Sequence, residues 1–175
     1  SATLRENVVS LARNIGYVPR SRKCAQAVVD FQYKFTGNSN TVTLKQGLAL
    51  VGAVKNTSYV FSVPEDVSVT SPLDSGGISG NNSPRTATFS GVTVYQGTLL
   101  TKKFTVNGSS DQRFILENSF VDLDTLRVTV KKSGSSAGLK FSKIDNIIDV
   151  TSVSNVYLVQ EVKNETYELL FGDGL

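Results

Sequence analysis

The N-terminal residues 3–15 follow the hydrophobic period of an α-helix. Four aliphatic side chains recur at spacings of three and four, which places them on one face of a helix. They are Leu4, Val8, Leu11 and Ile15. Thr3 and Glu6 have the spacing of a capping box, and Gly16 supplies a helix stop. Since so short a helix is marginal alone in water, we expect its aliphatic face to pack on the protein's own sheet or on a neighbouring protein.

From residue 27 onward the pattern changes to the two-residue period of β-strands. Val29, Phe31 and Phe35 alternate with polar residues, which predicts a half-buried strand. The expected strands cover residues 29–35, 41–44, 59–63, 67–70, 87–95, 99–106, 113–116, 126–130, 144–150, 156–162 and 166–171. Residues 71–85 are rich in Gly, Pro, Ser and Asn and predict a long loop.

These short strands with frequent turns predict a mainly β fold of antiparallel sheets, sandwich-like or in two small β subdomains, with one N-terminal α-helix. We expect residues 1–24 to form the helix and a basic segment, and residues 25–175 to form the β-rich core. Within that core, residues 91–131 are a candidate for a small inserted β subdomain.

Several features of the composition narrow the class of protein. The 175 residues include no His, so catalytic nucleophiles activated by His and most zinc sites are excluded. Cys24 is the only cysteine, which excludes an internal disulfide and fits a reducing cytoplasm. The chain has no Met and ends in a turn motif directly after a strand, so we expect it to be a fragment of a larger protein. No apolar run has the length of a membrane span.

The net charge of +3 is concentrated near the N-terminus. Residues 1–24 carry five basic residues and one acidic residue. Four of the basic residues lie near or after the C-terminal end of the helix, namely Arg13, Arg20, Arg22 and Lys23. Because Tyr17 is the only aromatic residue near them, we expect a solvated or partner-facing basic rim and no nucleic-acid partner.

Carboxylate pairs are the remaining candidates for chemistry, because hydrolysis by acid–base catalysis needs only two. The pairs are Asp122 with Asp124, Asp145 with Asp149, and Glu165 with Glu168. Each lies beside a turn, where such side chains usually bind backbone amides and solvent, so we assign no catalytic, cofactor-binding or metal-binding residue. Asp122 and Asp124 lack the spacing of an EF-hand calcium loop.

Six segments, in order along the chain, resemble the baseplate J-like wedge proteins of contractile-tailed (T-even-type) phages. They are Ala2–Val9 with Gly16–Ser21, Tyr59–Asp66, Val92–Gly97, Phe120–Asp122 with Leu126–Val130, Val156–Glu161, and Tyr167–Gly174. Gln96 replaces the acidic residue usual in the third segment. The downstream half of that family is missing from this chain.

The resemblance implies a structural role without catalysis or cofactor. Such proteins form a ring around the tail hub, hold other wedge subunits and rearrange when the baseplate switches. We therefore expect a location in the virion tail baseplate after assembly in the host cytoplasm, with wedge subunits and further copies of itself as partners, and no membrane partner. The expected contact residues are the four aliphatic and four basic residues named above. The alternative is a glycan- or host-recognition β-module of a tail spike or fibre, which would need exposed aromatic side chains.

Overall fold

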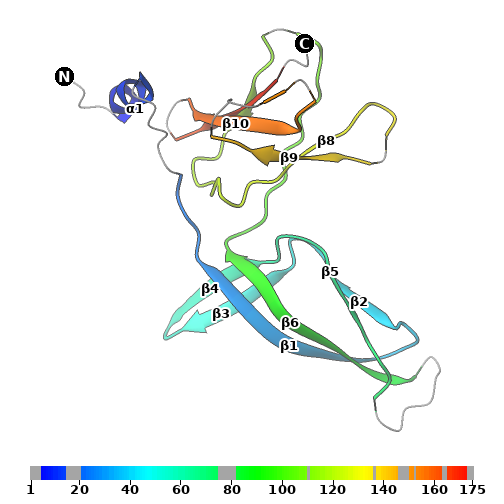
Figure 1. Cartoon of the computed structure of the whole chain (residues 1–175). Coiled ribbons are helices and arrows are strands. Elements are labelled where there is room, and N and C mark those ends of the chain that lie inside the picture. Colours follow the sequence, from blue (N-terminus) through cyan, green and yellow to red (C-terminus); the bar gives the residue numbers. More distant parts are fainter. Residues whose placement is uncertain are drawn as a thin grey trace. The chain divides into compact units, whose positions relative to one another are not determined.

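A computed structural model describes residues 5–14, 21–74, 82–109, 111–135, 137–145, 150–151, 153–162 and 165–172. The described chain is mostly β, with several antiparallel sheets and one short N-terminal helix, which confirms the fold class expected from the sequence (Figure 1). Among these residues, no helix has the length and apolar character needed to cross a bilayer.

The chain divides into two compact units. One unit is Cys24–Thr101, and the other combines Ser1–Lys23 with Lys102–Leu175. Residue 91, where a small inserted subdomain was a candidate to begin, lies inside a continuous strand of the first unit.

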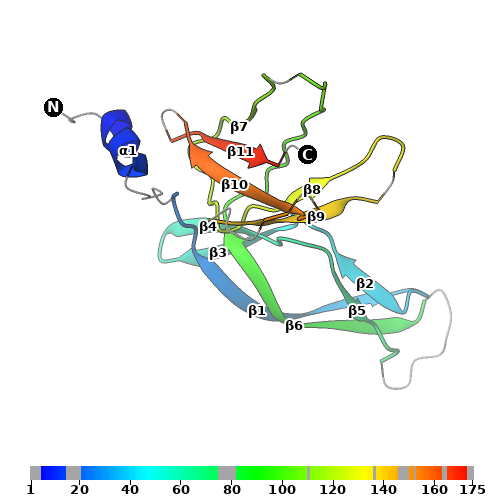
Figure 2. The same cartoon turned by 45° about the horizontal axis from the view of Figure 1, so that its top comes forward.

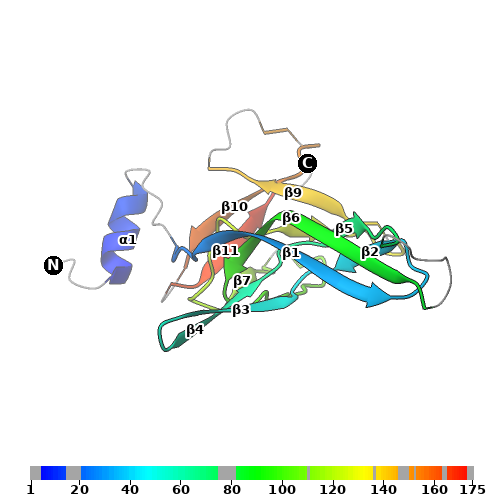
Figure 3. The same cartoon turned by 90° about the horizontal axis from the view of Figure 1, so that it is seen from below.

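The unit formed by residues 24–101 contains a four-stranded and a two-stranded antiparallel sheet. Its strands are β1 (Gln26–Thr36), β2 (Thr41–Leu44), β3 (Ala49–Val54), β4 (Thr57–Ser62), β5 (Val67–Thr70) and β6 (Pro84–Gln96). The larger sheet has the order β1-β6-β4-β3, and β2 pairs with β5. The long strands β1 and β6 lie side by side in all three views (Figures 1, 2 and 3).

A β-bulge in β6 keeps its apolar residues on the core side. Val29 pairs with Val92 but Phe31 pairs with Phe89, so two residues of β6 face Asp30 alone. Gly91, the extra residue, has φ +67, and its amide donates to Asp30 Oδ1 at 2.6 Å. The inward positions therefore shift from odd to even numbers along the strand, and Val92 becomes buried.

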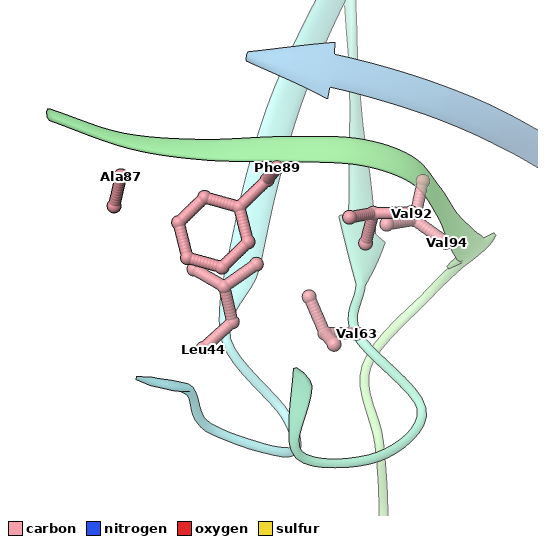
Figure 4. Packing of buried hydrophobic residues seen from close by; sticks show 6 residues of the cluster. All are labelled: Leu44, Val63, Ala87, Phe89, Val92 and Val94. Atoms are coloured by element: carbon pink, nitrogen blue, oxygen red, sulfur yellow. The ribbon is translucent and has the colours of Figure 1, made fainter. Parts of the chain in front are cut away.

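The core of this unit is formed mainly by β6. The buried residues of this cluster are Leu44, Val63, Ala87, Phe89, Val92 and Val94. Figure 4 shows Leu44 and Val63 lying below the β6 side chains, and Phe31 stacks on Phe89 with ring centroids 5.0 Å apart. The alternating pattern of the sequence thus corresponds to a packed apolar layer.

Arg85 is buried near the start of β6 and donates hydrogen bonds to two other segments of the chain. Its Nε donates to Gly37 O at 2.9 Å, and its Nη1 donates to Ser71 O at 2.6 Å. The carbonyls belong to the turn after β1 and to the residue after β5. The guanidinium therefore satisfies backbone groups that the sheets leave unpaired.

The second unit contains the helix and a five-stranded mixed sheet. Its elements are α1 (Arg5–Asn14), β7 (Phe114–Leu116), β8 (Val128–Val130), β9 (Leu139–Lys143), β10 (Val156–Glu161) and β11 (Tyr167–Phe171). The sheet order is β7-β11-β10-β9-β8, in which only the β9–β10 pair is parallel among the described strands. Figure 2 shows β10 beside β11 in this sheet.

Aromatic rings pack around Phe171 in this unit. Phe114, Phe141 and Tyr157 lie with ring centroids 5.4, 5.9 and 6.3 Å from Phe171. Tyr157 is fully buried, and burial raises the pKa of its hydroxyl. These contacts join β7, β9, β10 and β11 through side chains from four separate parts of the sequence.

Some expected strands differ from the structure. The prediction of a strand at 99–106 is wrong, since residues 98–109 form no strand. Side chains of this segment instead contact the neighbourhood of β7: Phe104 packs edge-on against Phe114 at 5.5 Å, and Lys102 pairs with Glu117 at 3.6 Å. Strands β3 and β9 were not expected, and of the strand expected at 144–150, residues 146–149 lie outside the described residues.

Candidate protein-interaction site

The helix expected at residues 3–15 is present as α1, Arg5–Asn14. Val8 and Leu11 lie on its described part with exposed fractions of 50% and 58%, whereas Val9 is buried. Leu4 and Ile15, the other two aliphatic residues of the expected contact face, lie outside the described residues. The two that are described therefore present aliphatic surface to solvent.

Arg22, in the basic segment after the helix, contacts its own unit. Its guanidinium carbon lies 4.3 Å from the centre of the Phe120 ring, and its Nε lies 3.5 Å from Glu165 Oε2. A cation above an aromatic face is attracted by the ring quadrupole. More than half of the Arg22 side chain stays exposed, so it also remains accessible from outside.

Ser21 and Lys23 fix the same segment to the turn at residues 121–125. Ser21 Oγ accepts a hydrogen bond from the buried Leu123 amide at 3.0 Å. Lys23 Nζ lies 3.6 Å from Asp124 Oδ2, and Lys143 Nζ lies 4.0 Å from Asp124 Oδ1. The contacts of Ser21 and Phe120 had no signal in the sequence, because their partners are about a hundred residues away along the chain.

For the other two basic residues of the expected contact set, the structure gives no side-chain position. Arg13 lies in α1, but its side chain lies outside the described residues, as does Arg20 entirely. The structure thus brings Arg22 and Lys23 to one part of the unit and leaves the predicted roles of Arg13 and Arg20 as predictions.

The first carboxylate pair forms a turn. Asp122 Oδ1 accepts the amide of Asp124 at 2.9 Å, and Asp122 O accepts from the Thr125 amide and hydroxyl. This is the local backbone hydrogen bonding that the sequence suggested for these residues. Asp149 of the second pair lies outside the described residues.

Glu168 of the third pair is buried, in contrast to the turn position expected for it. It lies in β11, and its carboxylate accepts from Arg113 Nε at 2.7 Å, Arg113 Nη2 at 2.8 Å and Gln160 Nε2 at 2.9 Å. These donors, led by Arg113, lower the pKa of Glu168 below its usual value. The hydrogen bond to Glu168 in turn raises the pKa of Arg113. The buried carboxylate of β11 is therefore hydrogen-bonded by a residue of β10 and by the residue before β7.

Among the described residues, no group of three or more potential metal-ligating side chains comes together. An open hollow of about 470 Å³ lies in the unit formed by residues 24–101. Its lining residues are Val69, Thr70, Pro72, Thr86 and Thr88, which offer hydroxyl groups but no ionisable side chain.

The tyrosines that the alternative glycan-binding function would use all lie in strands. Tyr157 and Tyr167 are buried, and Tyr95 is partly buried. Tyr33 and Tyr59 are exposed, and Tyr33 stacks on Phe35 at 5.5 Å.

The segments that carry the family resemblance are mostly strands of the four-stranded and five-stranded sheets. Tyr59–Asp66 covers most of β4 and ends at Asp66, whose carboxylate is hydrogen-bonded within the same unit. Asp66 accepts from the Gln46 amide at 2.8 Å and from Lys45 Nζ at 2.7 Å, which lowers its pKa. The later segments lie on the second half of β6 and on β8, β10 and β11.

Comparisons with protein families and curated proteins identify no relative of this chain. No family model matches the chain. A search of curated proteins also finds no match.

Proposed function

We propose that the chain is a structural component of the baseplate wedge of a contractile-tailed phage. In this function it binds other wedge subunits and further copies of itself, takes part in ring formation, and moves with the baseplate conformational switch. It catalyses no reaction, uses no cofactor, and binds neither nucleic acid nor membrane. Its place is the tail baseplate of the virion, assembled in the host cytoplasm.

The ordered series of six sequence segments supports this proposal. The described parts of five of them lie on strands or on the turns beside strands, so the resemblance involves residues that build the two β units. A rigid β framework of this kind suits a subunit that neighbouring proteins bind.

The exposed aliphatic face of α1 is the observation that carries the interaction role. Val8 and Leu11 are about half exposed, and a helix of ten residues is marginal without packing. Covering both side chains would contribute roughly 1.5–3 kcal/mol before ordering costs. Arg22 and Lys23, which follow the helix in the sequence, keep much of their surface exposed and add positive charge for an acidic rim on a partner.

Immunogold labelling of intact phage particles tests the proposed function. Antibodies raised against the 175-residue chain should label the baseplate end of the tail in electron micrographs. Labelling at the tips of spikes or fibres would instead support the glycan-recognition alternative. Particles that lack the protein altogether would contradict both functions.

A further inference from the structure

The β3–β4 hairpin is an apolar ribbon that the rest of its unit covers only at the base. Strand β4 pairs with β6 only through Phe61 and Ser62, and Gly97 adds one hydrogen bond to Val60 O. Beyond this point β3 and β4 pair only with each other among the described strands. Figures 1 and 3 show the hairpin tip extending past the paired parts of β1 and β6.

Both faces of this ribbon expose hydrophobic side chains. Val51 and Val54 have exposed fractions of 70% and 63%, and Tyr59 and Val60 beside them are also exposed. An isolated two-stranded hairpin is at best marginally stable in water, and clustered exposed apolar residues usually mark an interaction surface. The ribbon therefore has the character of a surface that is covered in an assembly.

Among the described strands, β3 pairs with β4 on one side only, so the backbone groups on its other side form an open sheet edge. The turn is formed by two residues, with Val54 opposite Thr57, and the Val63 amide donates to Leu48 O at 3.0 Å. Hydrogen-bonded positions alternate in an antiparallel pair, so the even-numbered residues face β4. The N–H and C=O groups of Ala49, Val51 and Ala53 consequently point toward the free edge.

This edge lacks the charges found on the opposite edge of the same four-stranded sheet. Strand β1, at that opposite edge, carries Asp30 and Lys34. Strand β3 has no charged residue over its six positions. Natural proteins usually place charges on exposed edges to prevent pairing with another chain, so an uncharged apolar edge favours such pairing.

We propose that β3 pairs antiparallel with β3 of a second copy of this chain. With Val51 opposite Val51 of the other copy, Ala49 lies opposite Ala53, and all three outward positions form hydrogen-bonded pairs. Lys55 then faces Gly47 of the other copy, so no like charges stand opposite each other. The two four-stranded sheets become one continuous sheet.

A second copy suits this edge better than a charged strand does. A charged partner strand would lose solvation beside Val51 and Val54, whereas another β3 is neutral and equal in length. A two-fold pairing is also closed, because both copies use the same edge, and the other edge of the four-stranded sheet is charged. This inference does not depend on the proposed baseplate function.

Cysteine cross-linking tests the register. The test variant is Val51→Cys in a Cys24→Ser background, and the matched control is Val28→Cys in the same background. Val28 is 63% exposed and lies on β1, at the other edge of the same sheet. Hydrogen-bonded partners have Cα atoms about 5.5 Å apart, within disulfide range. The Val51→Cys variant should give a disulfide-linked dimer under mild oxidation, and the control should stay largely monomeric.

Sedimentation measures the same contact without cross-linking. The unmodified chain should be dimeric, Val51→Lys should weaken dimerisation at least about tenfold, and Val28→Lys should leave it unchanged. Circular dichroism checks that both variants fold. A chain that is monomeric at about 100 µM, or a dimer that Val51→Lys leaves intact, would overturn the proposal.

Discussion

Arg113 and Glu168 form a two-point ion pair across 55 positions of sequence. The distances are 2.7 Å from Nε to Oε1 and 2.8 Å from Nη2 to Oε2. Gln160 donates to the same carboxylate at 2.9 Å, so one side chain of β11 connects a residue of the neighbouring strand β10 with the residue before β7. Only 6% of the Glu168 side chain is exposed, and this makes the contact a structural element of the sheet.

Replacing this carboxylate should destabilise the five-stranded sheet. Glu168→Gln keeps the shape but removes the charge that accepts three hydrogen bonds. Hydrogen bonds to charged groups contribute about 1.5–3 kcal/mol, so we expect a loss of this size in the free energy of unfolding. Urea unfolding followed by tyrosine circular dichroism measures it. The exposed Glu117→Gln is the matched control and should show no resolvable change.

The same ion pair predicts a loss of stability in acid. Hydrogen bonds from Arg113 lower the pKa of Glu168 below its usual 4.5, so the unfolded chain binds this proton more tightly than the folded chain. The stabilisation is fully present above about pH 4.5 and is lost as the pH falls through the lowered pKa. The difference in unfolding free energy between the unmodified chain and Glu168→Gln should therefore shrink from pH 7 to pH 3. An unchanged difference would contradict the assigned cause.

Arg85 should resist substitution by lysine. Its planar guanidinium reaches Gly37 O and Ser71 O together, and a lysine ammonium cannot reproduce that fork. We expect Arg85→Lys to lower the stability of the unit formed by residues 24–101 by about 1.5–3 kcal/mol. Hydrogen exchange should show faster exchange in β1, β5 and β6. The reverse change on an exposed site of β1, Lys34→Arg, should have no such effect.

Gly91→Ala tests the bulge of β6. Nothing lies within 4 Å of the added Cβ, so the cost comes from the left-handed backbone alone. That cost is about 1–2 kcal/mol for a residue with a side chain. Gly52→Ala, at a glycine with ordinary strand geometry and 3.9 Å of clearance to Phe61, should cost less. Thermal unfolding of the two variants compares them directly, and equal losses would rule out backbone strain as the cause.

Local patterns in the sequence were sufficient for several elements. The alternation around Phe31 and the capping and stop residues of the helix gave β1 and α1, because these elements depend on neighbours in sequence. No strand is predicted at residues 48–54, where Gly52 separates two short apolar runs. In the structure that glycine lies within β3 opposite Tyr59.

Other features depend on contacts that a local pattern does not contain. Residues 99–106 have a strand-like composition, but their side chains contact the neighbourhood of β7 without forming a strand. From the sequence, Glu168 was expected to bind backbone amides and solvent beside a turn. Only the fold places Arg113 next to its carboxylate. The positions of Val8 and Leu11 on one helix face were predictable, whereas the packing of Arg22 on Phe120 required the fold.

The most direct test of the assembly role is incorporation of a helix variant into baseplates. Val8→Asp combined with Leu11→Asp places charge on the exposed face of α1 and should leave the β units folded. A matched control, Val28→Asp with Val106→Asp, places two aspartates at other exposed aliphatic positions. Tagged proteins supplied during infection, followed by quantification of the tag in purified tails, report incorporation. We predict that the helix variant is lost from baseplates while the control is retained; equal incorporation of the two would contradict the account.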